Sequence, residues 1–117
     1  MHVRSVVKTV NHPNLAILWD CMHTQRMGEH PEETMGVIGN LTRHLHAHDG
    51  RYVDNGNKLE TTGLGEGELD HGTPVKLLND VGFDGFFSVE VIHKPGSDHD
   101  ADGVMKQYSE GFKALLR

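Results

Sequence analysis

The sequence predicts an α/β fold in which about three parallel strands alternate with four helices. Short apolar runs typical of strands recur between segments whose apolar residues have helical spacing, in the order helix, strand, helix, strand, helix, strand, helix. A metal-competent side chain, acidic or histidine, stands at or near the end of each strand run. Strands that alternate with helices in this way form right-handed crossover units, in which the strands pair in parallel.

The composition narrows the class of protein and its partners. The 117 residues suffice for one domain with a modest core, and the range 1–117 is expected to be a single domain. Seventeen acidic residues against eleven Lys and Arg give a net charge of −6, so nucleic acid is not expected as a partner. The one cysteine, Cys21, excludes an internal disulfide, and there is no export signal or membrane-length apolar run, so we expect a cytoplasmic protein that does not engage a membrane.

The first element is predicted to be a helix, because four valines share one helical stripe: Val3, Val6, Val7 and Val10. The next run, Leu15 to Asp20, is continuously apolar up to its final acid, which is typical of a strand buried on both faces. Asp20 then lies at the carboxyl end of that strand. The segment from Cys21 to Glu29 is expected to be a polar loop.

The middle of the chain contains a strand with three histidines. It follows a short helix that is predicted to begin at Pro31 and to end at Gly39 or Asn40. Because side chains alternate along a strand, Leu41 to Asp49 places His44, His46 and His48 on one face. Such a row either faces water or converges on hydrogen-bond partners or a metal. The stretch from Gly50 to Gly72 is expected to be a long functional or mobile loop.

The last third supplies two more helices and a third strand. Thr73 is predicted to cap a helix whose buried stripe is Val75, Leu78 and Val81 and which ends at Gly82. Phe86 to Val91 is the third strand, with Glu90 near its end. The final helix is predicted from Ala101 to Arg117, capped by Asp98 or Asp100.

Three candidate metal ligands follow from this arrangement. Ligands of parallel α/β sheets bind beyond the carboxyl ends of the strands, where Asp20, His46 and Glu90 are expected. Carboxylates with an imidazole suit Mn²⁺, Mg²⁺, Co²⁺ or Zn²⁺, although each residue could instead be an isolated solvated side chain. His23 is a further ligand, a substrate contact or a surface residue, and His44 and His48 are supporting or substrate-contacting residues. The remaining interior histidines are expected at the surface: His12, His30, His71, His93 and His99.

Four motifs together carry a resemblance to a known family. They are Asp20-Cys21-Met22-His23, His44-Leu45-His46-Ala47-His48-Asp49, Gly63-Leu64-Gly65-Glu66-Gly67-Glu68-Leu69-Asp70 and Ser88-Val89-Glu90. In order and spacing they resemble the C-terminal part of the sugar phosphate isomerase/epimerase family, whose fold is the xylose-isomerase-like TIM barrel. The resemblance implies a partial TIM barrel, with strands like the sixth, seventh and eighth.

The resemblance also implies roles for individual residues. Asp20, His46 and Glu90 match the family's metal ligands, and His23 matches a position that contacts substrate. Glu90 would also be an acid/base carboxylate that moves a proton next to a carbonyl, through a metal-stabilised enediolate. His48 and Glu66 are further expected substrate contacts.

The resemblance leaves the barrel incomplete, because a full barrel has eight strands and the family's fourth ligand and second base is a Glu on the fifth. We therefore expect the chain to form a homo-oligomer or to pair with a missing barrel portion, with activity of the lone chain in question. The expected function is a sugar or sugar-phosphate isomerase or epimerase acting on a small sugar or keto substrate. The alternatives are a non-catalytic metal- or ligand-binding module that oligomerises, and a lyase or dehydratase on the same scaffold.

Overall fold

The computed structural model describes residues 2–91, 96 and 100–116 of the chain. Its elements are α1 (His2–Val10), β1 (Ile17–Asp20), α2 (Cys21–Arg26), α3 (Pro31–Ile38), the 3₁₀ turn η1 (Gly39–Leu41), β2 (Thr42–Ala47), β3 (Gly50–Val53), β4 (Lys58–Thr61), α4 (Gly72–Asp80), β5 (Phe86–Val89) and α5 (Ala101–Leu115).

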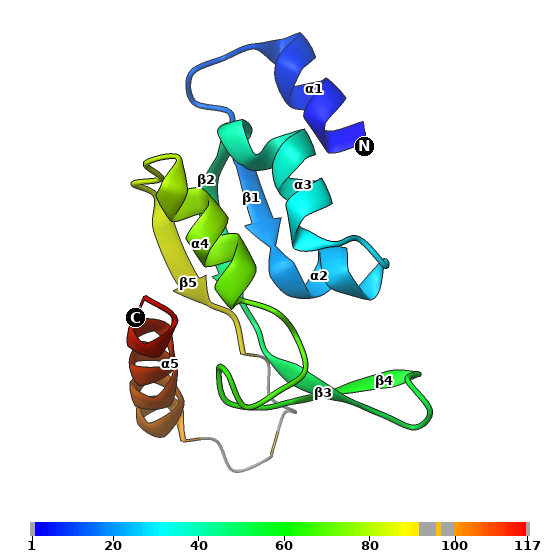
Figure 1. The fold of residues 1–117 in the computed structure, drawn as a ribbon, viewed down its shortest axis with the longest axis vertical. Coiled ribbons are helices and arrows are strands. Elements are labelled where there is room, and N and C mark those ends of the chain that lie inside the picture. The colour runs from blue at the N-terminus through cyan, green and yellow to red at the C-terminus, as the bar shows by residue number, and fades with distance from the viewer. Residues whose placement is uncertain (1, 92–95, 97–99, 117) are drawn as a thin grey trace.

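The predicted parallel sheet is confirmed. Its strand order is β1-β2-β5, with the middle strand paired in parallel to both neighbours. Helices α3 and α4 lie in front of this sheet in Figure 1, and all three strands point towards the same end of it. Asp20 is opposite His46 in the register, and His46 is opposite Ser88, so the strand ends are level with one another.

The helices cover one face of the sheet, and this face contains the core. Alternate side chains of the strands are buried here against side chains of the helices. The buried core residues are Val7, Ile17, Trp19, Cys21, Ile38, Leu45, Val75 and Leu78. Phe87 stacks on Phe112 of α5, with ring centroids 4.3 Å apart. Helices on a single face are the arrangement of a barrel wall, whereas a doubly wound sheet has helices on both faces.

The prediction that the first strand is buried on both faces is wrong. Leu18 is 48% exposed, and Phe86, which shares its face on the far strand, is 74% exposed. The described residues provide no second layer over this face, and its remaining side chains are largely polar. The strand is accordingly shorter than the apolar run that predicted it and begins at Ile17.

Helix α1 is confirmed, but its valine stripe is mostly exposed. Val7 alone of the four is buried, while Val3, Val6 and Val10 are 44%, 57% and 56% exposed. Figure 1 shows α1 at the upper end of the molecule, joined to β1 by a loop, so that only one side of the helix faces the core.

The segment expected as a polar loop begins with helix α2. The Asp20 carboxylate caps this helix by accepting hydrogen bonds from the main-chain N–H groups of Met22 and His23. Cys21 and Met22 are buried, so the short helix is held by its cap and by two apolar contacts.

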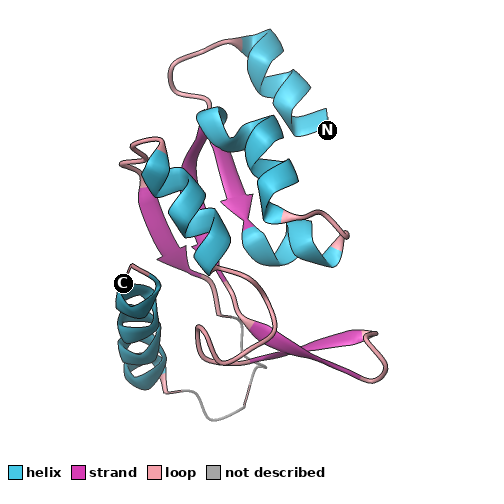
Figure 2. Ribbon diagram, viewed as in Figure 1, coloured by secondary structure: helices cyan, strands magenta, loops and turns pink. Residues whose placement is uncertain are grey.

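The expected long loop contains a β-hairpin. Strands β3 and β4 pair antiparallel and project from the body of the molecule, as Figure 2 shows. Asp54, Asn55 and Gly56 all have positive φ angles in the turn between them, a conformation that Asn, Asp and Gly adopt at least cost. This turn chemistry was present in the sequence and was the signal for the hairpin.

The remaining helices agree with the prediction except at their boundaries. Helix α4 begins at Gly72, before the predicted cap Thr73, whose N–H is accepted by the Asp70 carboxylate instead. Val81 is 64% exposed, because it follows the last turn of α4. Asp100 caps α5 by accepting from Gly103 N–H, and Asp98 lies outside the described residues.

Candidate metal centre

The structure brings the three predicted ligands together. One ligand atom from each of Asp20, His46 and Glu90 lies within 4.8 Å of the other two. Asp20 ends β1, His46 lies near the end of β2, and Glu90 follows β5, so each side chain comes from a different strand. The parallel register is what makes the three meet, since it aligns the carboxyl ends of neighbouring strands.

The Asp20 carboxylate is oriented by the helix that it caps. Its Oδ1 accepts from Met22 N at 2.9 Å and from His23 N at 3.2 Å. Its Oδ2 is left to face His46, 3.6 Å from Nδ1, and the side chain is only 11% exposed. Hydrogen bonds to the second oxygen of a ligating carboxylate are the usual outer support of a metal site.

His46 lies between the two carboxylates. Its Nδ1 is 3.2 Å from Glu90 Oε2, and the Glu90 main-chain N–H donates to Ala47 O at 2.9 Å. This main-chain bond fixes where the Glu90 side chain leaves the backbone, beside the residue that follows His46.

The spacing of the donor atoms fits a first-row divalent cation. Ligand bonds of about 2.1 Å in a tetrahedral site put neighbouring donor atoms about 3.4 Å apart. The separations of His46 Nδ1 from Glu90 Oε2 and Asp20 Oδ2, 3.2 and 3.6 Å, lie on either side of that value. Two oxygens and one imidazole nitrogen are also the ligands that such ions accept.

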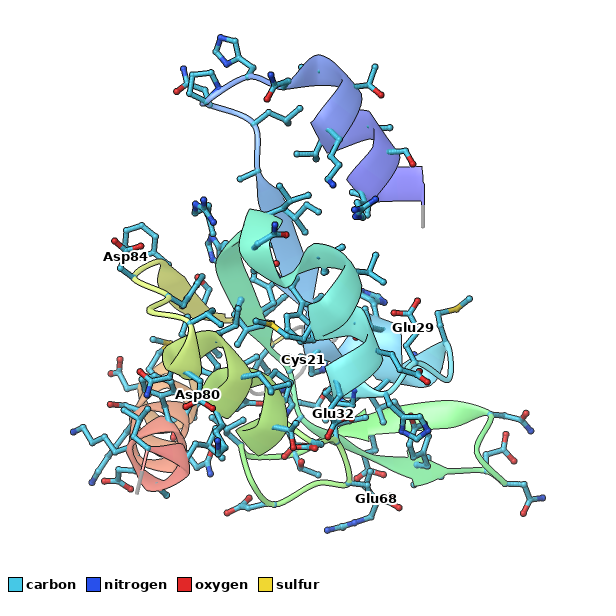
Figure 3. All side chains as sticks on the ribbon, turned by 45° about the horizontal axis from the view of Figure 1, so that its top comes forward. Cys21, Glu29, Glu32, Glu68, Asp80 and Asp84 are labelled. Carbon is cyan, nitrogen blue, oxygen red and sulfur yellow. The ribbon has the colours of Figure 1, made fainter. Side chains whose placement is uncertain are left out.

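Cys21 is adjacent to Asp20 but is not available as a ligand. It is fully buried on the helix-covered side, and Figure 3 places it in the interior, whereas Asp84 and Glu68 lie at the periphery. Burial, and to a lesser extent the charges of Asp20 and Asp70, raises the pKa of the Cys21 thiol well above its usual value. The thiol therefore stays protonated and soft-metal chemistry is not offered here.

Two further histidines border the centre. His23 is 70% exposed, and its Nε2 is 3.9 Å from Asp20 Oδ2, within reach of a ligand bound above the carboxylate. His44 lies one layer deeper on the same sheet face, with its ring edge against His46 at a centroid distance of 5.3 Å. Its Nε2 is hydrogen-bonded to the Ser88 hydroxyl.

His48 and Glu66, the other predicted substrate contacts, are not part of the cluster. His48 is 9% exposed, and its Nε2 is 3.1 Å from the Thr61 hydroxyl on the hairpin. Glu66 is exposed on the loop that follows the hairpin. No hydrogen bond or ion pair of the described residues joins either side chain to Asp20, His46 or Glu90.

The surface placement of His71 is wrong. This residue is 3% exposed, and its Nε2 accepts from His48 N–H at 3.3 Å. It lies at the start of α4, where the helix packs over the end of β2. His12 and His30 are exposed as expected, and His93 and His99 lie outside the described residues.

Asp49 is a site-bordering residue that the sequence did not indicate. It is fully buried directly after the histidine strand, and four main-chain N–H groups donate to its carboxylate. Three of these donors, Gly65, Gly67 and Leu69, belong to a distant loop, and the sequence reveals them only through the glycines of that loop.

Comparison with known proteins identifies the family. The xylose isomerase-like TIM barrel model matches residues 1–115, and the chain belongs to that family. The uncharacterized protein MJ1311 of Methanocaldococcus jannaschii is 33% identical over 87 residues, which are 73% of this chain and 28% of that protein.

Solved structures share the fold at low sequence identity. A xylose isomerase domain protein from Planctomyces limnophilus aligns with a TM-score of 0.69 and 19% identity, over 97% of this chain and 40% of its own. The IolI protein, solved with a bound zinc atom, aligns with a TM-score of 0.76 and 21% identity, over 97% of this chain and 41% of its own. The chain therefore matches part of a TIM barrel and spans less than half of these relatives. Among the described residues, no helix has the length and apolarity needed to cross a membrane.

Proposed function

We propose that this chain forms the metal-binding wall of a sugar or sugar-phosphate isomerase or epimerase. The observation that carries the proposal is the convergence of Asp20, His46 and Glu90, with His46 Nδ1 3.2 and 3.6 Å from the two carboxylates. The zinc atom in the structure of IolI supports a divalent ion in a relative of the same fold. The ion proposed for this chain is Mn²⁺, Mg²⁺, Co²⁺ or Zn²⁺.

The chemistry proposed is proton transfer next to a carbonyl. A bound divalent cation would polarise the substrate carbonyl and stabilise negative charge on its oxygen. Glu90 is the most exposed of the three side chains, at 38%, so its carboxylate is the one that a substrate can reach as a base. A positioned carboxylate of this kind contributes roughly 10²- to 10⁴-fold to proton transfer.

His23 is proposed to hold a substrate oxygen. Its side chain is 70% exposed next to the Asp20 carboxylate, so it faces the solvent side of the centre rather than the sheet. His48 and Glu66 remain proposed as substrate contacts. They would contact a substrate only where it lies against the loops above the strand ends. The hydrogen bond of His48 to Thr61 and the exposed position of Glu66 on the loop are consistent with this proposal.

The site is proposed to be completed by further polypeptide. The sheet face that carries Asp20 and His46 also carries the exposed Leu18 and Phe86, and three valines of α1 are exposed elsewhere on the surface. Apolar surface and strand edges of this kind are covered in stable proteins. The occupant is a second copy or the remaining barrel portion. The single, buried cysteine further supports a cytoplasmic location.

Calorimetry with Mn²⁺ tests the metal centre directly. Substitutions Asp20→Ala, His46→Ala and Glu90→Ala are each expected to weaken Mn²⁺ binding at least tenfold, because each removes one of three donor atoms. His12→Ala is the matched control, since His12 is exposed and remote from the strand ends. Equal retention of Mn²⁺ by all four variants would rule out the site.

A non-catalytic binding module is the second candidate. One observation favours it. Among the described residues, the group that could hold a metal contains two carboxylates, and because Asp20 caps α2, only Glu90 is left to act as an acid or base. Assays with Mn²⁺ on ketoses and ketose phosphates separate the two. Interconversion of sugars supports the isomerase or epimerase, release of water from the substrate supports a dehydratase, and no turnover by folded, metal-loaded protein supports the module.

A further inference from the structure

Asp49 makes an unusually complete set of hydrogen bonds for a buried carboxylate. Its Oδ1 accepts from Gly50 N at 2.8 Å and Leu69 N at 3.3 Å, and its Oδ2 accepts from Gly65 N at 2.8 Å and Gly67 N at 3.1 Å. The side chain is fully buried. Charge-assisted bonds to main-chain N–H groups are among the stronger hydrogen bonds in proteins. Because each oxygen already accepts two of them, Asp49 is not a metal ligand.

The glycines of the loop are required by this arrangement. Gly65 has a φ angle of +84°, which an L-residue adopts only with strain. A Cβ on Gly67 would lie 2.3 Å from Asp49 Oδ1 and 2.4 Å from Gly50 O, closer than atoms can approach. The motif Gly63-Leu64-Gly65-Glu66-Gly67 is therefore shaped to wrap a carboxylate of its own chain, and it needs no nucleotide to account for it.

The main chain of Asp49 is hydrogen-bonded to two further segments. Its N–H donates to the Tyr108 hydroxyl at 3.1 Å, and this hydroxyl donates to Thr62 O at 2.9 Å. Its carbonyl accepts from Thr62 N at 3.1 Å. Burial raises the pKa of Tyr108, which keeps the hydroxyl a donor. Helix α5, the end of β4 and the loop therefore meet at this one residue.

The same network reaches all three proposed ligands. His46 is three residues before Asp49, and Ala47, between them, accepts the main-chain N–H of Glu90. At the far end of the loop, Gln25 forms a pair of hydrogen bonds with the main chain of Asp70, at 2.7 and 2.8 Å. Gln25 belongs to α2, the helix that Asp20 caps.

We propose that Asp49 is a positioning residue of the metal centre: by gathering the amides of the 63–69 loop, it holds the strand ends of His46 and Glu90 and the helix of Asp20 in one arrangement. This rests on the proposed function, because it assigns Asp49 a role in placing those ligands. Removing its charge frees the loop and lets the three donor atoms separate. Outer residues that orient metal ligands typically affect metal affinity by about 10- to 100-fold.

The primary test is Asp49→Asn, which keeps the size of the side chain but turns one acceptor oxygen into a donor facing two N–H groups. We expect Co²⁺ and Mn²⁺ affinity to fall by about 10- to 100-fold, and the visible absorption of bound Co²⁺ to change because its coordination geometry changes. Asp54→Asn is the matched control. It removes the same charge from the exposed hairpin turn, where Asn tolerates the positive φ angle, and it should leave both readouts unaltered.

A second variant and the unmodified chain cover the case in which Asp49→Asn does not fold. Gly67→Ala displaces the loop from the other side while leaving Asp49 intact, and it should reproduce the loss and the spectral change. In the unmodified chain, metal binding must protect the Gly65, Gly67 and Leu69 amides from hydrogen exchange, because coupling between two sites is reciprocal.

The outcomes separate this proposal from the one on which it depends. Absence of metal binding by the unmodified chain overturns the metal centre itself. Metal binding that leaves the loop amides unprotected, or a folded Asp49→Asn chain with unchanged affinity and Co²⁺ spectrum, overturns the positioning role alone.

Discussion

Acid is expected to destabilise this protein through His71. Burial lowers the pKa of His71 below its usual value, and the charges of Asp49, Asp20 and Asp70 oppose this only in part. In the folded state its Nε2 must stay unprotonated, because it accepts the His48 N–H at 3.3 Å. The unfolded chain, with a pKa near 6.5, takes up a proton there as the pH falls, and stability falls with it.

The size of this effect has an upper bound. Each pH unit below the unfolded pKa costs about 1.4 kcal/mol for as long as the folded state stays neutral, so the loss between pH 7 and pH 5 is at most about 2 kcal/mol. Protonation in the folded state would instead leave the His48 N–H buried without an acceptor, at a cost of about 1 to 3 kcal/mol. Both routes penalise acid.

The assay is urea unfolding of metal-free protein at pH 7, 6 and 5. His71→Gln places an amide oxygen near the position of Nε2, and glutamine does not titrate. Between pH 7 and pH 5 the unmodified chain should therefore lose up to about 2 kcal/mol more unfolding free energy than the variant. His12→Gln is the control, because His12 is exposed. Parallel stability curves for the unmodified chain and His71→Gln would refute the reasoning.

Three more predictions follow from burial and backbone geometry. Leu45→Ala should cost about 2 to 5 kcal/mol in urea unfolding, since the side chain is 1% exposed, whereas Leu18→Ala, at 48%, should cost less than about 1 kcal/mol. Gly65→Ala should destabilise by about 1 to 2 kcal/mol because of its positive φ angle, while Gly36→Ala, in helix α3 with open space at its Cβ, should stabilise by about 0.5 to 1 kcal/mol. Light scattering should show association that grows with concentration. Phe86→Lys should weaken it, because the Phe86 side chain is 74% exposed on the uncovered face of the sheet. A monomer at every concentration would contradict the proposal that further polypeptide covers this face.

The parallel sheet and the ligand cluster could be predicted from the sequence because both depend on local patterns. Apolar runs located the strands, and the parallel arrangement then placed Asp20, His46 and Glu90 at one edge. A residue at the end of a buried strand is recognisable without knowledge of its distant contacts. The same local signal was present for the hairpin in the turn at Asp54 and Asn55, but the long polar stretch around it concealed the strands.

The support of the site could not be predicted in this way. His71 stands in a polar, glycine-flanked stretch and is buried only because α4 packs over the end of β2. Asp49 depends on main-chain donors up to 20 residues away. Helix α2 contains too few apolar residues to show a period, and it forms because Asp20 caps it. In each case tertiary contacts, rather than local propensity, determine the structure.

The order of strands and helices favours one way of completing the sheet. Helix α1 precedes β1, α5 follows β5, and both pack on the outer face. Two copies joined edge to edge would provide six strands and would bring α5 of one copy and α1 of the other to the same junction, where a barrel accommodates one helix. A remainder of five strands and four helices avoids that conflict.

The coverage of the solved structures agrees with such a remainder, since 40% and 41% are close to three strands of eight. Association of two copies would therefore bury the free edges of β1 and β5 without providing the other five strands of a barrel. For this reason a measured mass alone cannot test the proposed function. Metal affinity of the Asp20, His46 and Glu90 variants tests it directly, because those three donors lie within this chain.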